Sequence, residues 1–249
     1  MFLQFEGIEN ARDLGGLCRA DGARIKPGLL FRTGRLEHAT DGDIARLAGA
    51  GVRTIIDLRD PGERLRAPDR MVPGAENLSL PALPDLSDIM KPMDDGGFSA
   101  QRVHDDFIQI YRYLATSDAS IEAYKRFFAV LLASGGAPVL WHCTQGKDRT
   151  GVAALLLLTA LGIDGETIER EYLLTNEYAA EQLAGFERME NPPFPLDVAR
   201  EVFTVYADNL RLYTRCVQVE YGTVLNYLEL ALDVGPAEIE TLERYYLEW

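Results

Sequence analysis

The chain has 249 residues, of which 47% are hydrophobic, and it suits one large soluble domain, residues 1–249, with a sizeable core. Its 25 basic and 39 acidic residues give a formal net charge of −14. Nucleic acids and anionic membrane surfaces bind best to basic proteins, so this charge argues against either as a standing partner.

The sequence has no visible targeting segment, membrane span or metal-ligand pattern. The N-terminus has no basic start or long apolar segment, and the apolar run 152–161 is far shorter than the ~20 residues that span a bilayer. The three cysteines have no paired spacing for disulfides or zinc, and the three histidines are scattered. We expect a cytoplasmic protein with no transmembrane segment, metal or cofactor. No signal for an oligomeric state is visible.

The first half of the chain predicts strands and helices that alternate. Residues 9–16 form a leading loop, in which Arg12 either pairs with Asp13 or acts directly in an active site. Pro61 and Gly62 should break the chain, and residues 81–97 read as a loop that borders a substrate cleft. Strands are expected at 29–31, 52–58, 77–80 and 138–141, and helices at 40–51, 104–115, 119–133 and 150–161.

The segment 142–151 joins the strand at 138–141 to the buried helix that follows. A turn that enters a helix N-terminus directs free backbone N–H groups into one concavity, which attracts a dianion such as phosphate. We therefore expect a phosphate-binding loop, with contacts from Thr144, Gln145, Gly146, Lys147, Arg149 and Thr150.

Two side chains give this loop its predicted chemistry. Cys143 lies at its start, where the positive environment should ionise a thiol whose free pKa is about 8.5. Arg149 follows after five intervening residues and can hold two phosphate oxygens with its planar fork. This pattern indicates hydrolysis of a phosphate ester through a cysteinyl-phosphate. The alternative is a small core cysteine before a buried helix.

The other loop residues have supporting roles. Gly146 and Gly151 let the backbone curl, and the Thr150 hydroxyl can stabilise the thiolate. His142 should orient the loop through a ring N–H, and Lys147 should add a second cation at the rim. A Walker phosphate loop is ruled out because Asp148 stands where that motif needs Ser or Thr.

The string His-Cys-x-x-Gly-Lys-Asp-Arg-Thr-Gly resembles the signature of cysteine-dependent tyrosine phosphatases, and most closely their bacterial atypical lipid-like, or triple-specificity, branch. Segments 9–16, 28–34 and 55–59 match that branch, as does a C-terminal echo at 221–228. The resemblance covers nearly the whole chain. It implies a tyrosine-phosphatase-like α/β fold with a central, mostly parallel sheet flanked by helices. Export without a signal peptide is known in this family.

Asp57 and Arg59 end the strand at 52–58. Ligands bind outside the carboxyl ends of strands in open α/β sheets, so both side chains could reach the phosphate. Alternatively, they form a network with Asp60 and Arg64 that ties down the loop.

A general acid must protonate the leaving group. The Trp-Pro-Asp sequence that supplies it in ordinary tyrosine phosphatases is missing. The family resemblance supports Asp148 as acid and base. Asp57 is the second candidate, and Asp105 or Asp106, at a predicted helix start, is the third.

The second half of the chain is helical, and the resemblance implies a lid-like part at about 164–249. Helices are expected at 165–175, 176–190, 197–213 and 217–232, with a final one from Pro236 to the terminus and a stop at 191–195. Candidates for the lid surface are Phe194, Phe203, Tyr206, Leu210 and Tyr213, although plain core packing would also explain them.

The substrate class rests on the depth of the cup. A deep cup favours phosphotyrosine in proteins or peptides, whereas Lys147 could pair with a second phosphate and admit phosphoinositides, which the family also accepts. The neutral Thr144 and Gln145 and the acidic surface weigh against lipid. Two other classes are a phosphate-binding module without turnover and a thiol redox or sulfur-transfer enzyme.

Overall fold

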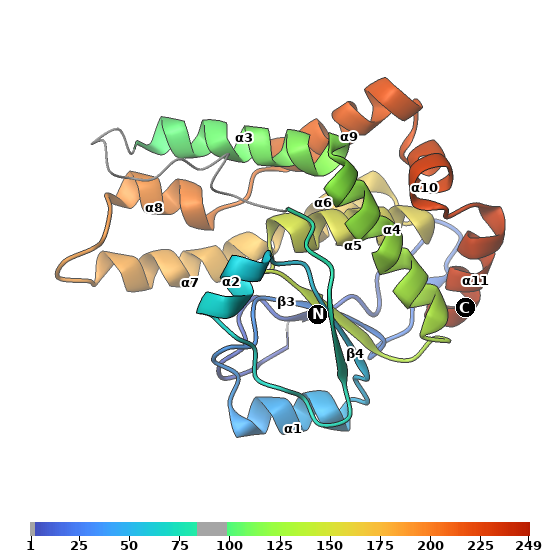
Figure 1. Cartoon of the computed structure of the whole chain (residues 1–249), viewed down its shortest axis with the longest axis horizontal. Helices are drawn as coiled ribbons and strands as arrows, with labels where there is room; N and C mark the ends of the chain where they lie inside the picture. The colour runs from blue at the N-terminus through green and yellow to red at the C-terminus, as the bar shows by residue number, and fades with distance from the viewer. Residues whose placement is uncertain (1–2, 84–98) are drawn as a thin grey trace.

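A computed structural model describes residues 3–83 and 99–249 of the chain and places a five-stranded sheet at its centre (Figure 1). The strand order is β1-β3-β6-β4-β5, with β1 antiparallel to β3 and the other pairs parallel. The strands are β1 Arg12–Asp13, β3 Leu30–Thr33, β4 Thr54–Asp57, β5 Glu76–Ser79 and β6 Val139–His142. The mostly parallel α/β sheet expected from the sequence is confirmed.

Alternation along the strands separates two hydrophobic layers, because successive strand residues point to opposite faces. Ile56, Val139 and Trp141 belong to a large core beneath most of the helices. Ile55 and Leu140 belong to a smaller core under α1, Asp41–Gly49. The sheet is therefore buried on both faces.

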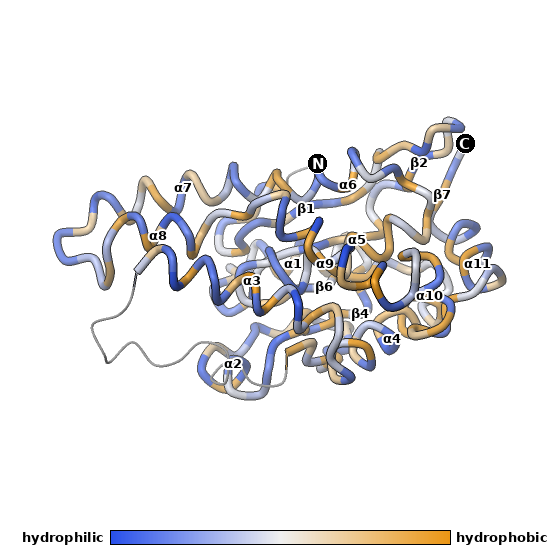
Figure 2. Tube along the Cα trace, turned by 90° about the horizontal axis from the view of Figure 1, so that it is seen from above, coloured by the Kyte–Doolittle hydropathy of each residue, from blue (hydrophilic) through white to orange (hydrophobic). Residues whose placement is uncertain are grey.

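Most helices cover one face of the sheet, and two project away from it. Figures 1 and 2 show α7 and α8 extending to one side together with the start of α3. The bounds are α3 Ala100–Thr116, α4 Asp118–Ala133, α5 Asp148–Ala160, α6 Gly165–Leu173, α7 Thr175–Glu187, α8 Leu196–Phe203, α9 Ala207–Tyr221, α10 Val224–Leu232 and α11 Pro236–Tyr246.

The predicted helix at 197–213 is wrong, since α8 ends and α9 begins inside it. The side-chain amide of Asn176 binds both backbone groups of Val205, at 2.8 and 2.9 Å, and so replaces the helical hydrogen bonds there. The helix expected at 217–232 is likewise interrupted, because Gly222 has φ +79° and Thr223 then caps α10.

The predicted chain break at Pro61 is also wrong, because α2, Pro61–Arg66, begins there. Asp60 caps this helix in a reciprocal capping box with Glu63, and proline is well suited to the first helical position. At the C-terminus the last helix ends at Tyr246, and β7, Leu247–Glu248, pairs with β2, Arg24–Ile25.

The predicted lid surface divides into two groups. Leu210 and Tyr213 are buried in the large core, so α9 is part of the body of the domain and their assignment to a lid surface is wrong. Phe194 and Phe203 pack instead on Phe186 of α7, with ring centroids 5.0 and 6.1 Å apart. Tyr206 lies edge-on to His104 of α3.

Two further expectations concern the outside of the domain. Most of the predicted cleft loop at 81–97 lies outside the described residues. In the ranges that the structure describes, every helix is too short or too polar to cross a membrane.

Candidate active site

The loop at 142–151 runs from β6 into α5, as the sequence predicts. Gly146 has φ +68°, and a Cβ there would lie 2.4 Å from the Thr33 carbonyl oxygen, so only glycine fits. Cys143 and Arg149 are 2% and 6% exposed. Both side chains are therefore buried, one at each end of the loop, and we call the side of the loop that faces them the cup.

The back of the loop is held through its carbonyl oxygens. The Asn10 amide donates to the carbonyls of Gln145 and Gly146, at 3.0 and 3.2 Å, and Arg32 Nη2 donates to Gly146 at 2.8 Å. In a trans peptide the N–H points away from the carbonyl of the same unit. The N–H groups that follow these two carbonyls therefore point away from Asn10 and Arg32, as an anion-binding loop requires.

A buried charge cluster supports these contacts. Glu171 of α6 binds Arg12 Nε at 2.7 Å and Arg32 Nη1 at 2.6 Å. Burial and the neighbouring Arg32 lower the pKa of Arg12 to about 10, which still leaves it charged at neutral pH. Burial favours a raised pKa for Glu171, but the two arginines outweigh it and the pKa is lowered. Arg12 therefore lies behind the loop, where it also donates to Thr175.

On the front, Glu63 of α2 binds both terminal nitrogens of Arg149, at 2.5 and 2.8 Å, and accepts from the Thr144 hydroxyl. Burial alone would raise the pKa of Glu63, but the hydrogen bonds and charge of Arg149 lower it far below its usual range. The guanidinium is thus held in one orientation by a bidentate pair. Sequence reasoning missed this residue, although the capping-box spacing from Asp60 to Glu63 marks its helix.

Asp148 stands in the first turn of α5 beside two tyrosines. The Tyr111 hydroxyl donates to Asp148 Oδ1 at 2.8 Å and lies 2.5 Å from the Tyr172 hydroxyl. Burial, and then the charge of Asp148, raise the pKa of Tyr111 well above its usual value, so it remains a donor. This places a carboxyl group, oriented by a hydrogen bond, next to Arg149.

Asp57 and Arg59 belong to a network rather than to the cup. Arg59 binds Asp57 at 2.8 Å and Asp69 at 2.5 Å, and Arg64 Nε lies 3.3 Å from Asp57. The second of the two sequence interpretations therefore describes this site better, with Asp69 in place of Asp60, which caps α2.

His142 connects this network to the loop. Its Nε2 lies 3.3 Å from Asp69 Oδ2, and its Nδ1 lies 3.1 Å from the Cys143 carbonyl oxygen. Burial would raise the pKa of Asp69, but His142 and Arg59 lower it. Asp57, Asp69 and His142 offer donor atoms within 4.8 Å of one another, as a metal site would. The guanidinium of Arg59 already binds both carboxylates and fills the role of a cation.

Lys147 lies elsewhere than expected. It is 3% exposed, its Nζ donates to the Val202 carbonyl of α8, and it lies 4.0 Å over the Phe107 ring. Burial lowers its pKa, partly offset by the charges of Asp148 and Cys143. The expected position at an open rim is wrong, because α3 and α8 cover this lysine.

The remaining candidates are placed as follows. Among the described residues, the buried Thr150 hydroxyl has no hydrogen-bond partner, so it remains available to a thiolate or a ligand. Asp105 and Asp106 lie inside α3 rather than at its start. Asp105 is exposed and accepts from Gln101, while burial raises the pKa of Asp106.

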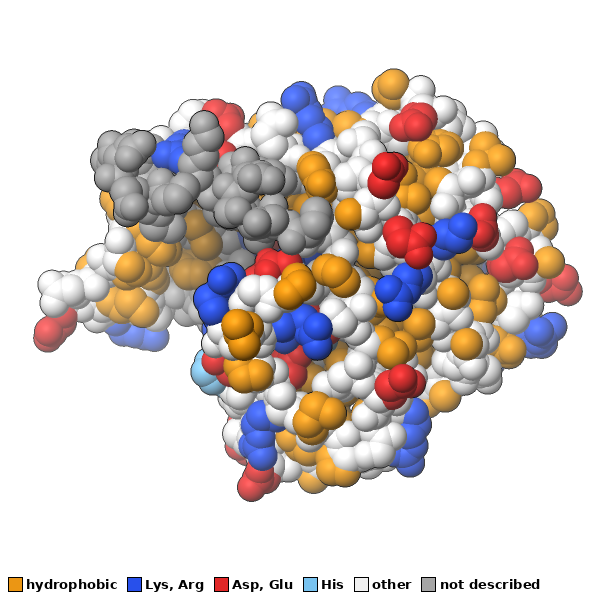
Figure 3. Space-filling model, viewed as in Figure 1, with side chains coloured by type: hydrophobic (Ala, Val, Ile, Leu, Met, Phe, Trp, Pro, Cys, Tyr) orange, Lys and Arg blue, Asp and Glu red, His pale blue; other side chains and the backbone are white. Residues whose placement is uncertain are grey.

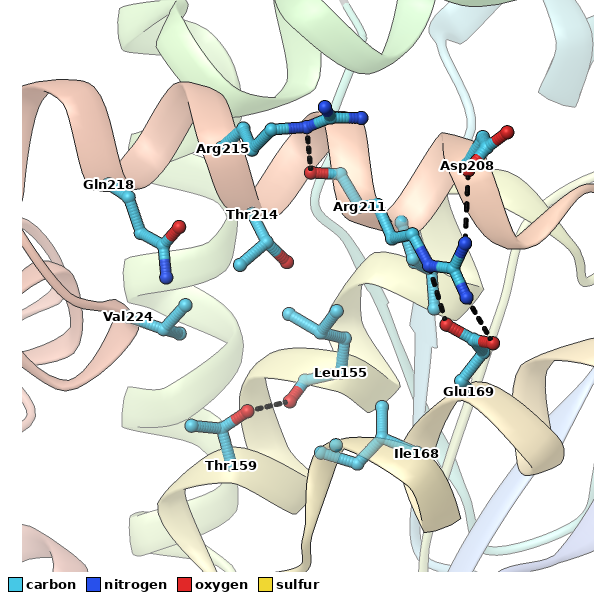
Figure 4. Close-up of a pocket in the computed structure, with 12 residues that line it drawn as sticks. Leu155, Thr159, Ile168, Glu169, Asp208, Arg211, Thr214, Arg215, Gln218 and Val224 are labelled. Atoms are coloured by element: carbon cyan, nitrogen blue, oxygen red, sulfur yellow. Dashed lines mark hydrogen bonds and ion pairs between the residues drawn. The ribbon is translucent and has the colours of Figure 1, made fainter.

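A separate pocket of about 630 Å³ lies between α5, α6, α9 and α10 (Figure 4). Its floor includes Leu155 and Ile168, and Arg211 binds Glu169 at 2.9 Å and Asp208 at 3.2 Å across its wall. Since its lining contains none of the loop residues 142–151, the cup and this pocket are different sites within the described chain.

The chain is similar to several known proteins. The tyrosine phosphatase family model matches residues 3–248. A candidate tyrosine-protein phosphatase of Cupriavidus necator is 35% identical over 95% of this chain and 86% of its own. The triple specificity protein phosphatase PtpB of Mycobacterium tuberculosis is 29% identical over 90% and 92% of the two chains. A crystal structure of P. aeruginosa TpbA in complex with pTyr aligns over 76% of this chain and 88% of its own, at 20% identity and a TM-score of 0.30.

Proposed function

The chain belongs to the tyrosine phosphatase family and is a phosphoric monoester hydrolase of that type; we propose that its catalytic residues are Cys143, Arg149 and Asp148. The observation that supports this assignment best is that the three side chains belong to one loop in which Cys143 and Arg149 are buried, Arg149 is held by Glu63 and Asp148 is held by Tyr111.

The first step transfers the phosphoryl group to sulfur. The Cys143 thiolate attacks phosphorus in line, so that an S–P bond forms while the bond from phosphorus to the leaving oxygen breaks. Asp148 gives its proton to that oxygen. Arg149, with the loop N–H groups, stabilises the charge on the three equatorial oxygens.

The second step returns the enzyme to its starting state. Asp148, now a carboxylate, takes a proton from a water molecule that attacks phosphorus. The S–P bond breaks, Cys143 leaves as a thiolate, and inorganic phosphate is released. In both steps Glu63 keeps the Arg149 guanidinium in position, and the buried cluster behind the loop keeps the backbone in shape.

The favoured substrates are phosphotyrosine proteins or peptides. Cys143 is almost wholly buried, and a long aryl side chain reaches such a depth better than serine or threonine does. Phosphoinositides are the second candidate, supported by the cation of Lys147, whose Nζ lies 3.8 Å from the Asp148 carboxylate.

The α7–α8 part acts as a lid in this proposal, and the chain remains a single domain. The Val202 carbonyl of α8 holds Lys147, and Glu201 of α8 pairs with His104 of α3. Glu201→Gln removes this ion pair, so it should change the turnover of a phosphotyrosine peptide more than that of p-nitrophenyl phosphate. Unchanged turnover of both substrates would argue against a lid.

The function is tested by phosphate release from a phosphotyrosine peptide and a soluble phosphoinositide, measured in parallel, with Cys143→Ser as the blank. Release from the peptide, lost in the variant and inhibited by orthovanadate, supports the protein phosphatase. Preference for the phosphoinositide would assign the specificity to Lys147. Release no higher than the blank from either would contradict the catalytic proposal and leave a phosphate-binding module or sulfur chemistry.

A further inference from the structure

The outer face of α2 carries an unusual combination of side chains for so acidic a protein. Leu65 is 84% exposed, the Arg64 side chain is 42% exposed, and Arg66 is exposed as well. We call these three residues the α2 surface. Figure 3 shows basic and hydrophobic side chains together over this helix.

The charge of the α2 surface differs from what its sequence indicates. Asp60, Glu63 and Asp69 accompany the arginines in this segment, but all three turn inward. Asp60 caps the helix, Glu63 binds Arg149, and Asp69 binds Arg59. The face that meets solvent is therefore positive, on a chain whose formal net charge is −14.

The two arginines of the α2 surface differ in their partners. The Nε of Arg64 lies 3.3 Å from the Asp57 carboxylate. Among the described residues no hydrogen bond or ion pair engages the Arg66 side chain, which lies over Gly62, 3.3 Å from the position of a Cβ there. An exposed leucine beside an unpaired guanidinium is a surface suited to a partner that is both acidic and partly apolar.

The position of the α2 surface relates it to the cup. Successive helix residues are about 100° apart, so Arg66 points about 60° away from Glu63 and Leu65 about 200° away, on a helix about 10 Å across. A peptide whose phosphate reaches Arg149 can therefore meet Arg66 first and then Leu65 within about three or four extended residues, at about 3.3 Å each.

We propose that the α2 surface binds the acidic residues of a phosphotyrosine peptide, within about three or four positions of the phosphorylated tyrosine. This inference rests on the phosphatase function proposed above and names its substrate class. A narrow acidic peptide fits better than an anionic membrane, because screening confines attraction to about 8 Å at physiological salt, and a wide flat surface would also meet the acidic faces around the patch.

The test compares two phosphotyrosine peptides, one with glutamates three and four positions from the tyrosine on both sides and one with glutamines there. Turnover of p-nitrophenyl phosphate, which is too small to reach the α2 surface, measures catalysis at the loop alone. The variants are Arg66→Glu and Leu65→Ala. Arg126→Glu, on the distant helix α4, carries the same change of net charge as a control (Figure 1).

The wild-type protein should have a KM about fivefold to tenfold lower for the glutamate peptide, and added salt should reduce the difference. Arg66→Glu should abolish or reverse this preference, and Leu65→Ala should raise the KM for both peptides about threefold. Turnover of p-nitrophenyl phosphate and the melting temperature should stay constant, and Arg126→Glu should behave as wild type.

Other results would overturn the inference. Equal KM values for the two peptides would overturn it, and so would equal effects of Arg66→Glu and Arg126→Glu. Normal turnover of p-nitrophenyl phosphate in the same samples would show that the proposed phosphatase function still holds. A loss confined to phosphoinositide in phosphatidylserine vesicles would assign the surface to membranes instead. A wild-type protein without p-nitrophenyl phosphate turnover would overturn the proposed function and this inference with it.

Discussion

The two sides of the loop at 142–151 use charge in different ways. On its back, Glu171 lies between Arg12 and Arg32, all three are buried, and no part of this cluster needs to change during a reaction. On its front, Glu63 holds Arg149 in an ion pair that must be kept, or shared, when a phosphate arrives.

Residues behind the loop should therefore contribute mainly to stability, and residues in front of it mainly to catalysis. Removing one member of a buried ion cluster leaves an uncompensated charge, which is costly to stability. Changing a group that acts mainly in the transition state lowers the rate while the folded state changes little. Variants on the back should therefore be seen first in unfolding experiments, and variants on the front in kinetics.

The largest effect is expected on the front, from Asp148→Asn. Loss of a general acid should lower kcat about 10²- to 10⁴-fold on a phenyl phosphate, whose leaving group needs a proton, and much less on p-nitrophenyl phosphate. Stability should change by less than about 1 kcal/mol. An unchanged pH–rate profile on the poor leaving group would contradict the assignment of Asp148 as the general acid.

On the back, Glu171→Gln should cost about 3 kcal/mol or more of unfolding free energy, because Arg12 and Arg32 would then repel each other in the core. Chemical denaturation at pH 7 measures it. The control is Glu169→Gln on the same helix, whose partner Arg211 is 56% exposed and whose ion pair should contribute about 1 kcal/mol at most. Similar losses of unfolding free energy in the two variants would mean that the buried cluster stabilises the fold no more than an exposed ion pair does.

Glu63→Gln should lower both the catalytic rate and the stability of the fold. We expect kcat/KM to fall about tenfold to 100-fold as Arg149 loses its orientation, and stability to fall by about 2 kcal/mol at pH 7. A higher affinity for inorganic phosphate in the variant would show that Glu63 competes with the substrate instead.

The stability difference between the wild type and Glu63→Gln should depend on pH in one direction. The pKa of Glu63 is lowered in the folded state, so the unfolded chain binds the proton more tightly and acid favours unfolding. The stability gap between wild type and Glu63→Gln should be complete above the unfolded value of about 4.3 and shrink as the pH falls below it. A gap that grew in acid would contradict the proposed pairing.

The smallest effect is expected from Tyr111→Phe, which removes the donor to Asp148. Without that hydrogen bond the Asp148 carboxyl group loses its fixed orientation, so kcat at neutral pH should fall about threefold. The facing Lys147, 3.8 Å away, and Tyr172 stay in place. Tyr113→Phe, on the same helix, serves as control, and identical kcat values for both variants would rule out a role for the Tyr111 hydroxyl.

The sequence could predict what is local to the loop. The strand, the turn and the buried helix follow one another directly, so Cys143, Asp148 and Arg149 are placed by short-range rules. Glu63 lies 86 residues from Arg149, and Arg12 lies 159 residues from Glu171. Neither pairing leaves a periodic signal, because one acidic residue among 39 looks like any other until the fold selects it.

Two of the errors have the same long-range origin. Lys147 looked like a rim residue because the α8 carbonyl that buries it comes 55 residues later. The boundary between α8 and α9 was missed because Asn176 of α7 imposes it from another helix. The error at the short helix α2 has a local reason, since a proline followed by a glycine is typical of a chain break, whereas here the proline occupies the first position of a helix.

The position of β6 in the sheet has a consequence for biosynthesis. This strand pairs with β3 on one side and β4 on the other, so without it the sheet separates into β1–β3 and β4–β5. During translation those earlier strands emerge first and wait, with apolar faces uncovered, for residues 139–142. Chaperone contact should therefore concentrate on nascent chains that stop before this point. The same four residues that complete the sheet also bring the proposed nucleophile, Cys143, into place.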